Sequence, residues 1–299
     1  MIRIRGQIAV QAILLVSMAI WGLNVTIVKQ LTGSLDPPTI AMLRMLVATA
    51  TLTAIWLARR PALARLDRRQ WLGLAACAFL MVYMNQILFT EGMVRTSATN
   101  GALIMALGPL VSAILAALAF RERLGPLRLF GVLLGFGGVA IIILGHSDSQ
   151  LAVMGVGDLL VVAGILSFSC GGALIQGIAR RLDPLSISVI IYAMGALMLI
   201  GHTGLWGPGY GGALPGSAWL WFLILFSGSV STAIVNLIWN NAIARIGVAR
   251  AAVFLYWVPV FGAAFAALLL GEHMGWNHLL GLVAVMVGTY LGTQSRNPV

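Results

Sequence analysis

A succession of long apolar runs, repeated from one end of the chain to the other, limits what this sequence can fold into. Each run is close to the ~20 residues that cross a bilayer as a helix. Only 9% of the 299 residues are charged and 60% are hydrophobic, whereas a soluble domain carries ~25% charged residues. The mean hydropathy is +1.00. The alternating segments of ~10 residues that mark transmembrane strands do not occur in the sequence. We therefore predict an all-α membrane protein.

Short loops with turn residues such as Asp36-Pro37, Gly125-Pro126 and Asp183-Pro184 divide the apolar runs. The basic start resembles a signal peptide, but its apolar run continues to about Leu31, so we expect an uncleaved first helix. The sequence predicts ten transmembrane helices, at residues 8–31, 37–58, 70–92, 97–120, 126–144, 155–180, 184–205, 216–244, 248–270 and 274–293.

The positive charges predict the orientation of these helices. With the N-terminus inside, fifteen of the eighteen Lys and Arg residues fall in cytoplasmic loops and tails, Lys29 and Arg95 lie outside, and Arg44 lies within a span. This distribution follows the positive-inside rule. We expect a multi-pass protein of the cell inner membrane with both termini in the cytoplasm. The net charge of +10 is thereby explained by topology, and no nucleic-acid partner is expected.

The two halves of the sequence resemble each other. A shift of 150 residues aligns residues 95–138 with 245–288 without a gap, and twelve of the 44 positions match, including Pro109 with Pro259 and Glu122 with Glu272. We predict a five-helix repeat at residues 1–148 and a second at 149–299, in one integrated transmembrane domain. Because five is odd, the second repeat enters the membrane from the opposite face. Inverted repeats are typical of secondary transporters that work by alternating access.

Several segments resemble the EamA group of the drug/metabolite transporter superfamily. "DPPTIAMLRMLVA", from Asp36, resembles its early second helix, and "WGLNVTIVK", from Trp21, its first. The segments ending in "FRERLG" and "LGEHMG" resemble its paired fourth and ninth helices. This resemblance covers nearly the whole chain and implies a ten-helix carrier, often an exporter of amino acids or other metabolites. The chain is also similar to YddG-type exporters of aromatic amino acids and methyl viologen. A shift of 147 residues aligns Leu35-Asp36-Pro37 with Leu182-Asp183-Pro184, and under this shift the chain departs from the pattern at Ile191, which aligns with Arg44.

Polar residues at helical spacing suggest a central cavity. Phe79, Tyr83, Gln86 and Thr90 share one face of the third span, and the shift of 150 carries the last two onto Asn236 and Asn240. A polar seam that joins the helices is the alternative. For each aromatic residue alone, core packing or the interfacial belt remains open. The candidate lining residues are Trp21, Asn24, Phe79, Tyr83, Gln86, Met105, Asn236, Asn240, Tyr256 and Trp257.

Charged and proline residues within the spans complete the list of candidates. Arg44 must face protein or water, because an unpaired charge in lipid is costly. In a structural role, Arg44 would pair with Glu91 or cap backbone carbonyls. In a functional role, it would belong to a gate with Glu91 or attract a substrate carboxylate. Pro109 and Pro259 each remove a helical hydrogen bond and are candidate hinges, although a static kink is equally compatible with the sequence.

The pattern favours a carrier over an enzyme or a pore. The sequence has no His-Glu-x-x-His, Gly-x-Ser-x-Gly or Walker A motif, and we expect no cofactor and no metal. The candidate cavity offers aromatic, amide and hydroxyl groups without a central acid, which suits a neutral or zwitterionic solute. We therefore expect export of amino acids, aromatic or otherwise apolar, with broad drug or metabolite efflux as the alternative. The expected partners are a small-molecule substrate and the lipid bilayer, and the protein is expected to be a monomer.

Overall fold

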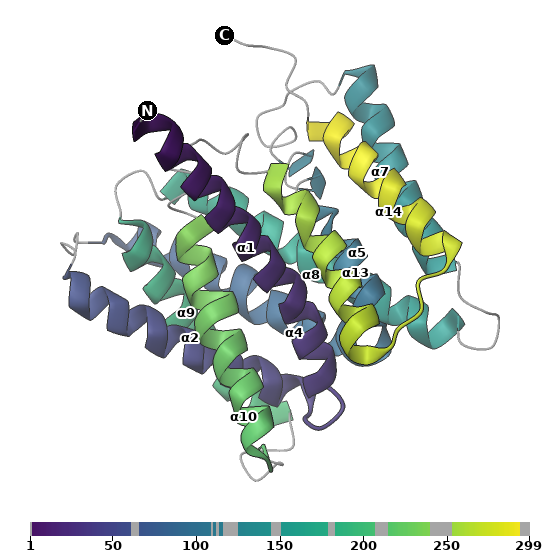
Figure 1. The fold of residues 1–299 in the computed structure, drawn as a ribbon. Helices are drawn as coiled ribbons and strands as arrows, with labels where there is room; N and C mark the ends of the chain where they lie inside the picture. Colours follow the sequence, from purple (N-terminus) through teal and green to yellow (C-terminus); the bar gives the residue numbers. More distant parts are fainter. Residues whose placement is uncertain are drawn as a thin grey trace.

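The computed structural model describes residues 2–60, 66–108, 110–111, 114–115, 125–144, 151–178, 183–206, 215–239 and 253–293. This part of the chain is helical and contains no strand, which confirms the all-α prediction. Within the described residues, six helices are long and apolar enough to cross a membrane, and three shorter apolar helices accompany them. Figure 1 shows the helices packed side by side, with the start of the first and the end of the last at the same end of the molecule.

Residues up to 144 form the first group of helices. The second of them begins where Asp36 accepts a hydrogen bond from the Thr39 amide at 3.0 Å and prolines fill the first two helical positions. It ends where Arg60 adopts a left-handed conformation, with φ of 45°. The elements are α1 (Ile2–Leu31), α2 (Pro37–Arg59), α3 (Arg68–Cys77), η1 (Ala78–Met84), α4 (Asn85–Arg95), α5 (Ala98–Met105) and α7 (Pro126–Leu144).

Residues from 151 onward form the second group. Asp183 accepts a hydrogen bond from the Ser186 amide at 2.9 Å, so the helix after Pro184 begins in the same way as α2. The elements are α8 (Leu151–Ile178), α9 (Pro184–Trp206), α10 (Ala218–Leu225), η3 (Phe226–Ile234), η4 (Val253–Tyr256), α13 (Trp257–Leu270) and α14 (Trp276–Thr293).

Two irregular features occur at matching positions of both groups. The segments η1 and η3 are π-helical, and the shift of 150 residues carries 78–84 onto 228–234, within η3. The α-helical pattern is also interrupted just after Met105 and just before Trp257. Each interruption lies close to the residue four positions before a proline, the place where the proline ring obstructs the preceding turn.

Glycine residues bring helix backbones into close contact. The helix α7 packs along α14, and a Cβ atom built on Gly138 would lie only 2.8 Å from both Gly281 O and Val285 N. Between α1 and α13, a Cβ atom on Gly22 would lie 2.6 Å from the Gly262 amide nitrogen. Small residues permit such approaches in the absence of a hydrophobic driving force between helices in lipid.

Replacing Gly138 by leucine is expected to separate α7 from α14 and to cost ~3 kcal/mol or more of stability, because backbone atoms cannot yield as a flexible side chain does. The adjacent Gly137 is the control, since a Cβ atom there meets nothing within 4 Å. The apparent melting temperature in detergent measures the effect. Equal melting temperatures for Gly138→Leu and Gly137→Leu would show that this close approach does not hold the two helices together.

Candidate functional site

A cluster of polar side chains surrounds Arg44, deep between the helices. Arg44 lies on α2, and its side chain is buried, with 2% of the residue exposed. Its Nε donates to the Ser227 hydroxyl of η3 at 2.6 Å, and its Nη1 donates to Gln86 Oε1 of α4 at 3.0 Å. Both acceptors are neutral, so neither balances the charge of the guanidinium.

The hydrogen bonds continue outward from Arg44 in two directions. The Ser227 hydroxyl donates to Asn24 Oδ1 of α1 at 2.5 Å. The Gln86 amide donates to Asn85 Oδ1 at 3.1 Å, and Asn85 donates in turn to the Gly164 carbonyl of α8 at 2.9 Å. We call these five side chains the Arg44 cluster: Asn24, Arg44, Asn85, Gln86 and Ser227. It joins α1, α2 and α4 from the first group of helices to η3 and α8 from the second.

Close backbone packing positions the cluster. A Cβ atom built on Gly228 would lie 2.6 Å from the carbonyl oxygen of Arg44, so α2 and η3 touch where Arg44 meets Ser227. The π-helical turn of η3 also directs the Thr232 hydroxyl to the Ser227 carbonyl at 2.9 Å, five residues back. Single π-turns are frequent at functional sites because they rotate the side chains that follow.

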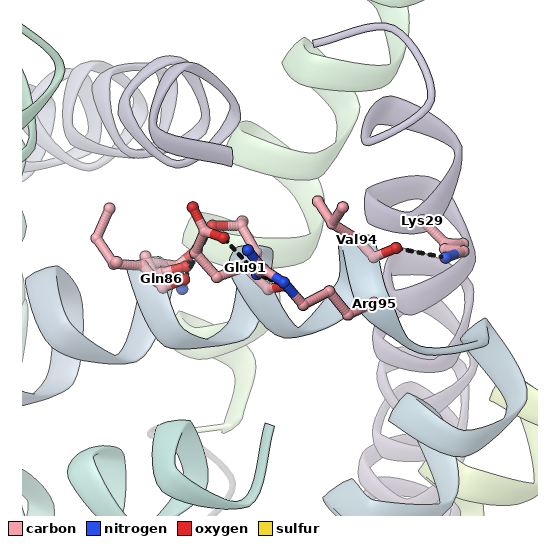
Figure 2. A network of polar contacts seen from close by, with 7 residues as sticks. Lys29, Gln86, Glu91, Val94 and Arg95 are labelled. Carbon is pink, nitrogen blue, oxygen red and sulfur yellow. Dashed lines mark hydrogen bonds and ion pairs between the residues drawn. The ribbon is translucent and has the colours of Figure 1, made fainter. Parts of the chain in front are cut away.

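The expected pairing of Arg44 with Glu91 is wrong. Glu91 accepts a hydrogen bond from Arg95, one turn further along α4, at 2.6 Å, and Figure 2 shows the two side chains meeting. This pair is partly exposed. Its spacing of four residues on one helix brings the two charges together without tertiary contacts, whereas Arg44 faces η3 and the amide of Gln86.

A second polar cluster closes the end of the molecule opposite the start of α1. Glu272, in the turn between α13 and α14, accepts the backbone amides of Ala98 and Thr99 at 2.8 Å each, and the Thr99 hydroxyl at 2.6 Å. The carboxylate therefore caps the N-terminus of α5 from a distant part of the chain. Anions are stabilised there by free amides and the helix dipole.

Lys29 and Asp158 extend this second cluster. Lys29, near the end of α1, donates to the carbonyls of Met93 at 2.9 Å and Thr96 at 2.5 Å, where α4 ends, and Figure 2 shows its further contact with the Val94 carbonyl. The fully buried Asp158 of α8 accepts from the Thr96 hydroxyl and from Asn100 Nδ2. We call Lys29, Thr96, Thr99, Asn100, Asp158 and Glu272 the distal cluster.

Three further candidates make polar contacts outside the Arg44 cluster. Trp21 donates to the Ser231 carbonyl at 2.9 Å and its ring lies 5.7 Å from that of Trp239. Tyr83 shares a 2.8 Å hydrogen bond with His202 of α9. Asn236 donates to the Thr232 carbonyl of its own helix at 2.6 Å. The structure thus brings Trp21, Asn24 and Gln86 to the α1–η3 and α2–α4 contacts around Arg44.

The remaining candidates are not part of this group. Phe79 and Trp257 are 44% and 47% exposed, Met105 packs against a buried apolar core, and Pro259 is buried in the first turn of α13. The backbone of Tyr256 ends the short helix η4. Asn240 and Pro109 lie outside the described residues.

Two hollows lie at other places in the structure. One, of about 220 Å³, lies between α2 and α9, where Trp56 donates to Ser186 at 3.0 Å. The other, of about 230 Å³, lies between α1 and Ile238. Both are lined mainly by apolar side chains, and Arg44 does not line either of them. The candidate lining residues therefore stay a prediction.

Sequence reasoning missed several members of the two clusters, including Ser227, Asn85 and Asp158. Asn85 could have been identified as a candidate from the sequence, because it directly precedes Gln86 in an apolar run. Ser227 carried a weaker signal, since serine is common in membrane helices and bonds to its own backbone there. Its contact with Arg44 crosses 183 residues of sequence, a separation that no local pattern reports.

Comparison with known proteins assigns the family. The sequence profile of the EamA-like transporter family matches residues 9–144 and again residues 155–293. A probable amino-acid metabolite efflux pump of Escherichia coli K12 is 26% identical over 288 residues, which cover 93% of this chain and 92% of the pump.

Two further likenesses extend the comparison. An S-adenosylmethionine/S-adenosylhomocysteine transporter of Chlamydia trachomatis serovar L2 is 27% identical over 267 residues, which cover 85% of this chain and 79% of that protein. A solved crystal structure superimposes with a TM-score of 0.67 and 18% identity over 95% of this chain and 98% of the other. At that identity, the likeness concerns the fold alone.

Replacing Glu272 by alanine is expected to release the N-terminus of α5. Losing a charge-assisted hydrogen bond costs ~1.5–3 kcal/mol, so the amides of Ala98 and Thr99 should exchange hydrogen at least ~10-fold faster. Hydrogen exchange followed by mass spectrometry over residues 96–103 measures this. The same substitution at the partly exposed Glu91 should leave these amides unchanged, and equal exchange in both variants would contradict the capping role of Glu272.

Replacing Arg44 by methionine is expected to leave the stability of the fold unchanged or to raise it by ~1–4 kcal/mol, because an uncompensated buried charge is removed while the volume is nearly kept. Ser227 still donates to Asn24 and Gln86 Nε2 still donates to Asn85, so the loss is limited to the two bonds that Arg44 itself donated. The apparent melting temperature in detergent is the measurement, with Arg59→Met at the exposed end of the same helix as the control. A large drop confined to Arg44→Met would show that Arg44 holds the fold together.

Proposed function

The chain belongs to the EamA-like transporter family, and from that premise we propose that it is a carrier that exports amino acids, chiefly those with aromatic or other apolar side chains, and related metabolites. The observation that carries the proposal is the Arg44 cluster. It lies between helices of both groups, and it consists of amide and hydroxyl groups around one guanidinium, without a carboxylate. Such walls suit a zwitterionic solute better than an organic cation, which would need an acid.

The relatives support a small-molecule cargo of this class. One is named as a probable amino-acid metabolite efflux pump and another as a transporter of S-adenosylmethionine, itself an amino-acid derivative. Trp21 donates to the Ser231 carbonyl at the α1–η3 contact, and its ring lies beside that of Trp239, so the two rings offer an apolar surface for a side chain. Export by alternating access from the cell inner membrane is the mechanism that we propose.

Alternating access requires two similar halves, and several observations support an inverted repeat of residues 1–148 and 149–299. The family profile matches twice, and the π-helical segments η1 and η3 correspond. Equivalent contacts also occur between the halves: α2 of the first half packs on η3 of the second, and α9 of the second packs on η1 of the first. The proposed topology has ten spans with both termini in the cytoplasm, in keeping with the charge distribution.

In this topology the distal cluster closes the outer side, and its contacts suggest how that side opens. Glu272 reaches from the second half to α5 of the first, and Asp158 of the second half meets Thr96 and Asn100 of the first. Opening outward would break these bonds between the halves. The interruptions near Met105 and Trp257 offer the flexible points that the candidate hinges Pro109 and Pro259 would use.

Counterflow in proteoliposomes tests the proposal. Vesicles loaded with unlabelled phenylalanine are expected to accumulate external radiolabelled phenylalanine transiently, with saturation at high concentration, because a carrier exchanges solute through one alternating site. Protein-free vesicles are the control, and the other proteinogenic amino acids are tested in the same way. A flux that rises linearly without counterflow would indicate a pore, and failure with every amino acid would contradict the proposed cargo.

A further inference from the structure

We propose that the guanidinium of Arg44 binds the carboxylate of the transported solute, so that a carboxylate is the part of the cargo that this protein requires. This inference rests on the proposed function and makes it more specific. It separates solutes that carry a carboxylate, with or without an amine, from organic cations and from amides, which the Arg44 cluster would not bind.

The first argument is the uncompensated charge. Arg44 is buried, and the hydrogen bonds that it makes within the described part of the chain go to a hydroxyl and an amide. No carboxylate of the described residues forms an ion pair with it, and Glu91 is engaged by Arg95. A buried charge normally has a partner of opposite sign, since its hydration has been lost. A bound carboxylate would supply that partner.

The second argument is the number of donors that remain. A guanidinium has five N–H donors, and the bonds to Ser227 and Gln86 use two of them, which leaves three. These three comprise both donors of Nη2 and one of Nη1. Two adjacent N–H groups in one plane match the two oxygens of a carboxylate, which is the arrangement that makes arginine selective for this ligand.

The third argument is that the cluster fixes the guanidinium in place. Ser227 donates its proton to Asn24, so its oxygen is left to accept from Nε. Gln86 is oriented likewise, because its amide group donates to Asn85, which is itself anchored on the Gly164 carbonyl. Each hydrogen bond fixes which atom of the next side chain is donor and which is acceptor. The plane of the guanidinium is therefore held before a ligand arrives. Such preorganisation reduces the entropy cost of binding.

The fourth argument is the comparison of equivalent contacts within the molecule. In the proposed repeat, the α2–η3 contact corresponds to the contact of α9 with η1 and the end of α3, where Ile191 replaces Arg44 and Cys77 replaces Ser227. Both replacements are buried in one apolar cluster. Apolar side chains therefore suffice to pack this kind of contact. The charge on the α2–η3 side is thus not explained by packing and is available for a ligand.

Four phenyl compounds test which end of an amino acid, the carboxylate or the amine, the protein recognises. Phenylalanine and 3-phenylpropionate carry the carboxylate, whereas phenylalaninamide and 2-phenylethylamine do not. Binding is measured by isothermal titration to the full chain in nanodiscs. We expect the two carboxylates to bind and the other two compounds to bind at least tenfold more weakly. Binding of 2-phenylethylamine as tight as that of phenylalanine would overturn the inference, as would the failure of every amino acid and of 3-phenylpropionate to bind.

Variants then locate the carboxylate site. Arg44→Met is expected to abolish the difference between the acid and the amide, and Arg44→Lys to weaken phenylalanine binding at least tenfold, since an ammonium lacks the planar pair of donors. Arg59→Met, at the exposed end of the same helix, should keep the wild-type Kd. If Arg44→Met does not fold, the Arg44→Lys variant and the binding of the four compounds to the wild-type protein still test the carboxylate site. Wild-type binding by a folded Arg44→Lys or Arg44→Met variant would overturn the inference.

The outcomes also separate this inference from the proposed function. Counterflow of amino acids with equal uptake of their amides would leave the carrier in place and refute the carboxylate site. Conversely, Arg44-dependent binding of 3-phenylpropionate, without counterflow of any amino acid, would keep the carboxylate site and refute the proposed cargo.

Discussion

The lack of water in the bilayer interior is the constraint on which the arrangement of polar groups in this protein depends. A donor or acceptor buried among these helices must find its partner in the protein. The distal cluster meets this demand with groups that are free at helix ends. Glu272 takes the amides at the start of α5, and Lys29 takes the carbonyls at the end of α4. Both charges thus bind backbone groups that have no partner within their own helix, and this accounts for their place near the ends of helices.

The Arg44 cluster answers the same constraint differently. There the donor is a side chain in the middle of a helix whose backbone is already satisfied, so only other side chains can act as acceptors. Close contact through Gly228 brings the Ser227 hydroxyl within reach, and neutral amides disperse the remaining polarity toward the Gly164 carbonyl. Hydrogen bonds to neutral dipoles stabilise the guanidinium of Arg44, but they do not neutralise its charge. A residual positive potential at the contact of the two halves is the physical result, and it distinguishes this site from the apolar contact at Ile191 and Cys77.

Local sequence rules predicted those features that depend on neighbours along the chain. The helical class follows from apolar runs, and the start of α2 follows from Asp36 and the two prolines. The Arg95–Glu91 pair also follows from its spacing of four residues, and this pair leaves Glu91 unavailable to Arg44. The partners of Arg44 were harder to predict. Ser227 lies 183 residues away, and the π-helical turns in η1 and η3 rotate side chains away from the faces that a regular helix of 3.6 residues per turn would give them.

An inverted repeat makes the two states of a carrier nearly equal in energy, since each half can adopt the conformation of the other. Residues that differ between the halves then decide how the symmetry is broken. In the proposed repeat, a guanidinium that is present in one half and replaced by isoleucine in the other cannot contribute equally to both states. If a carboxylate binds Arg44, the charge is balanced only while the solute is bound, so the empty and loaded carrier prefer different arrangements of the same contact. Differential affinity of this kind is the one means by which a ligand can shift a conformational equilibrium, and in the proposed carrier Arg44 would supply it without any titratable acid in the Arg44 cluster.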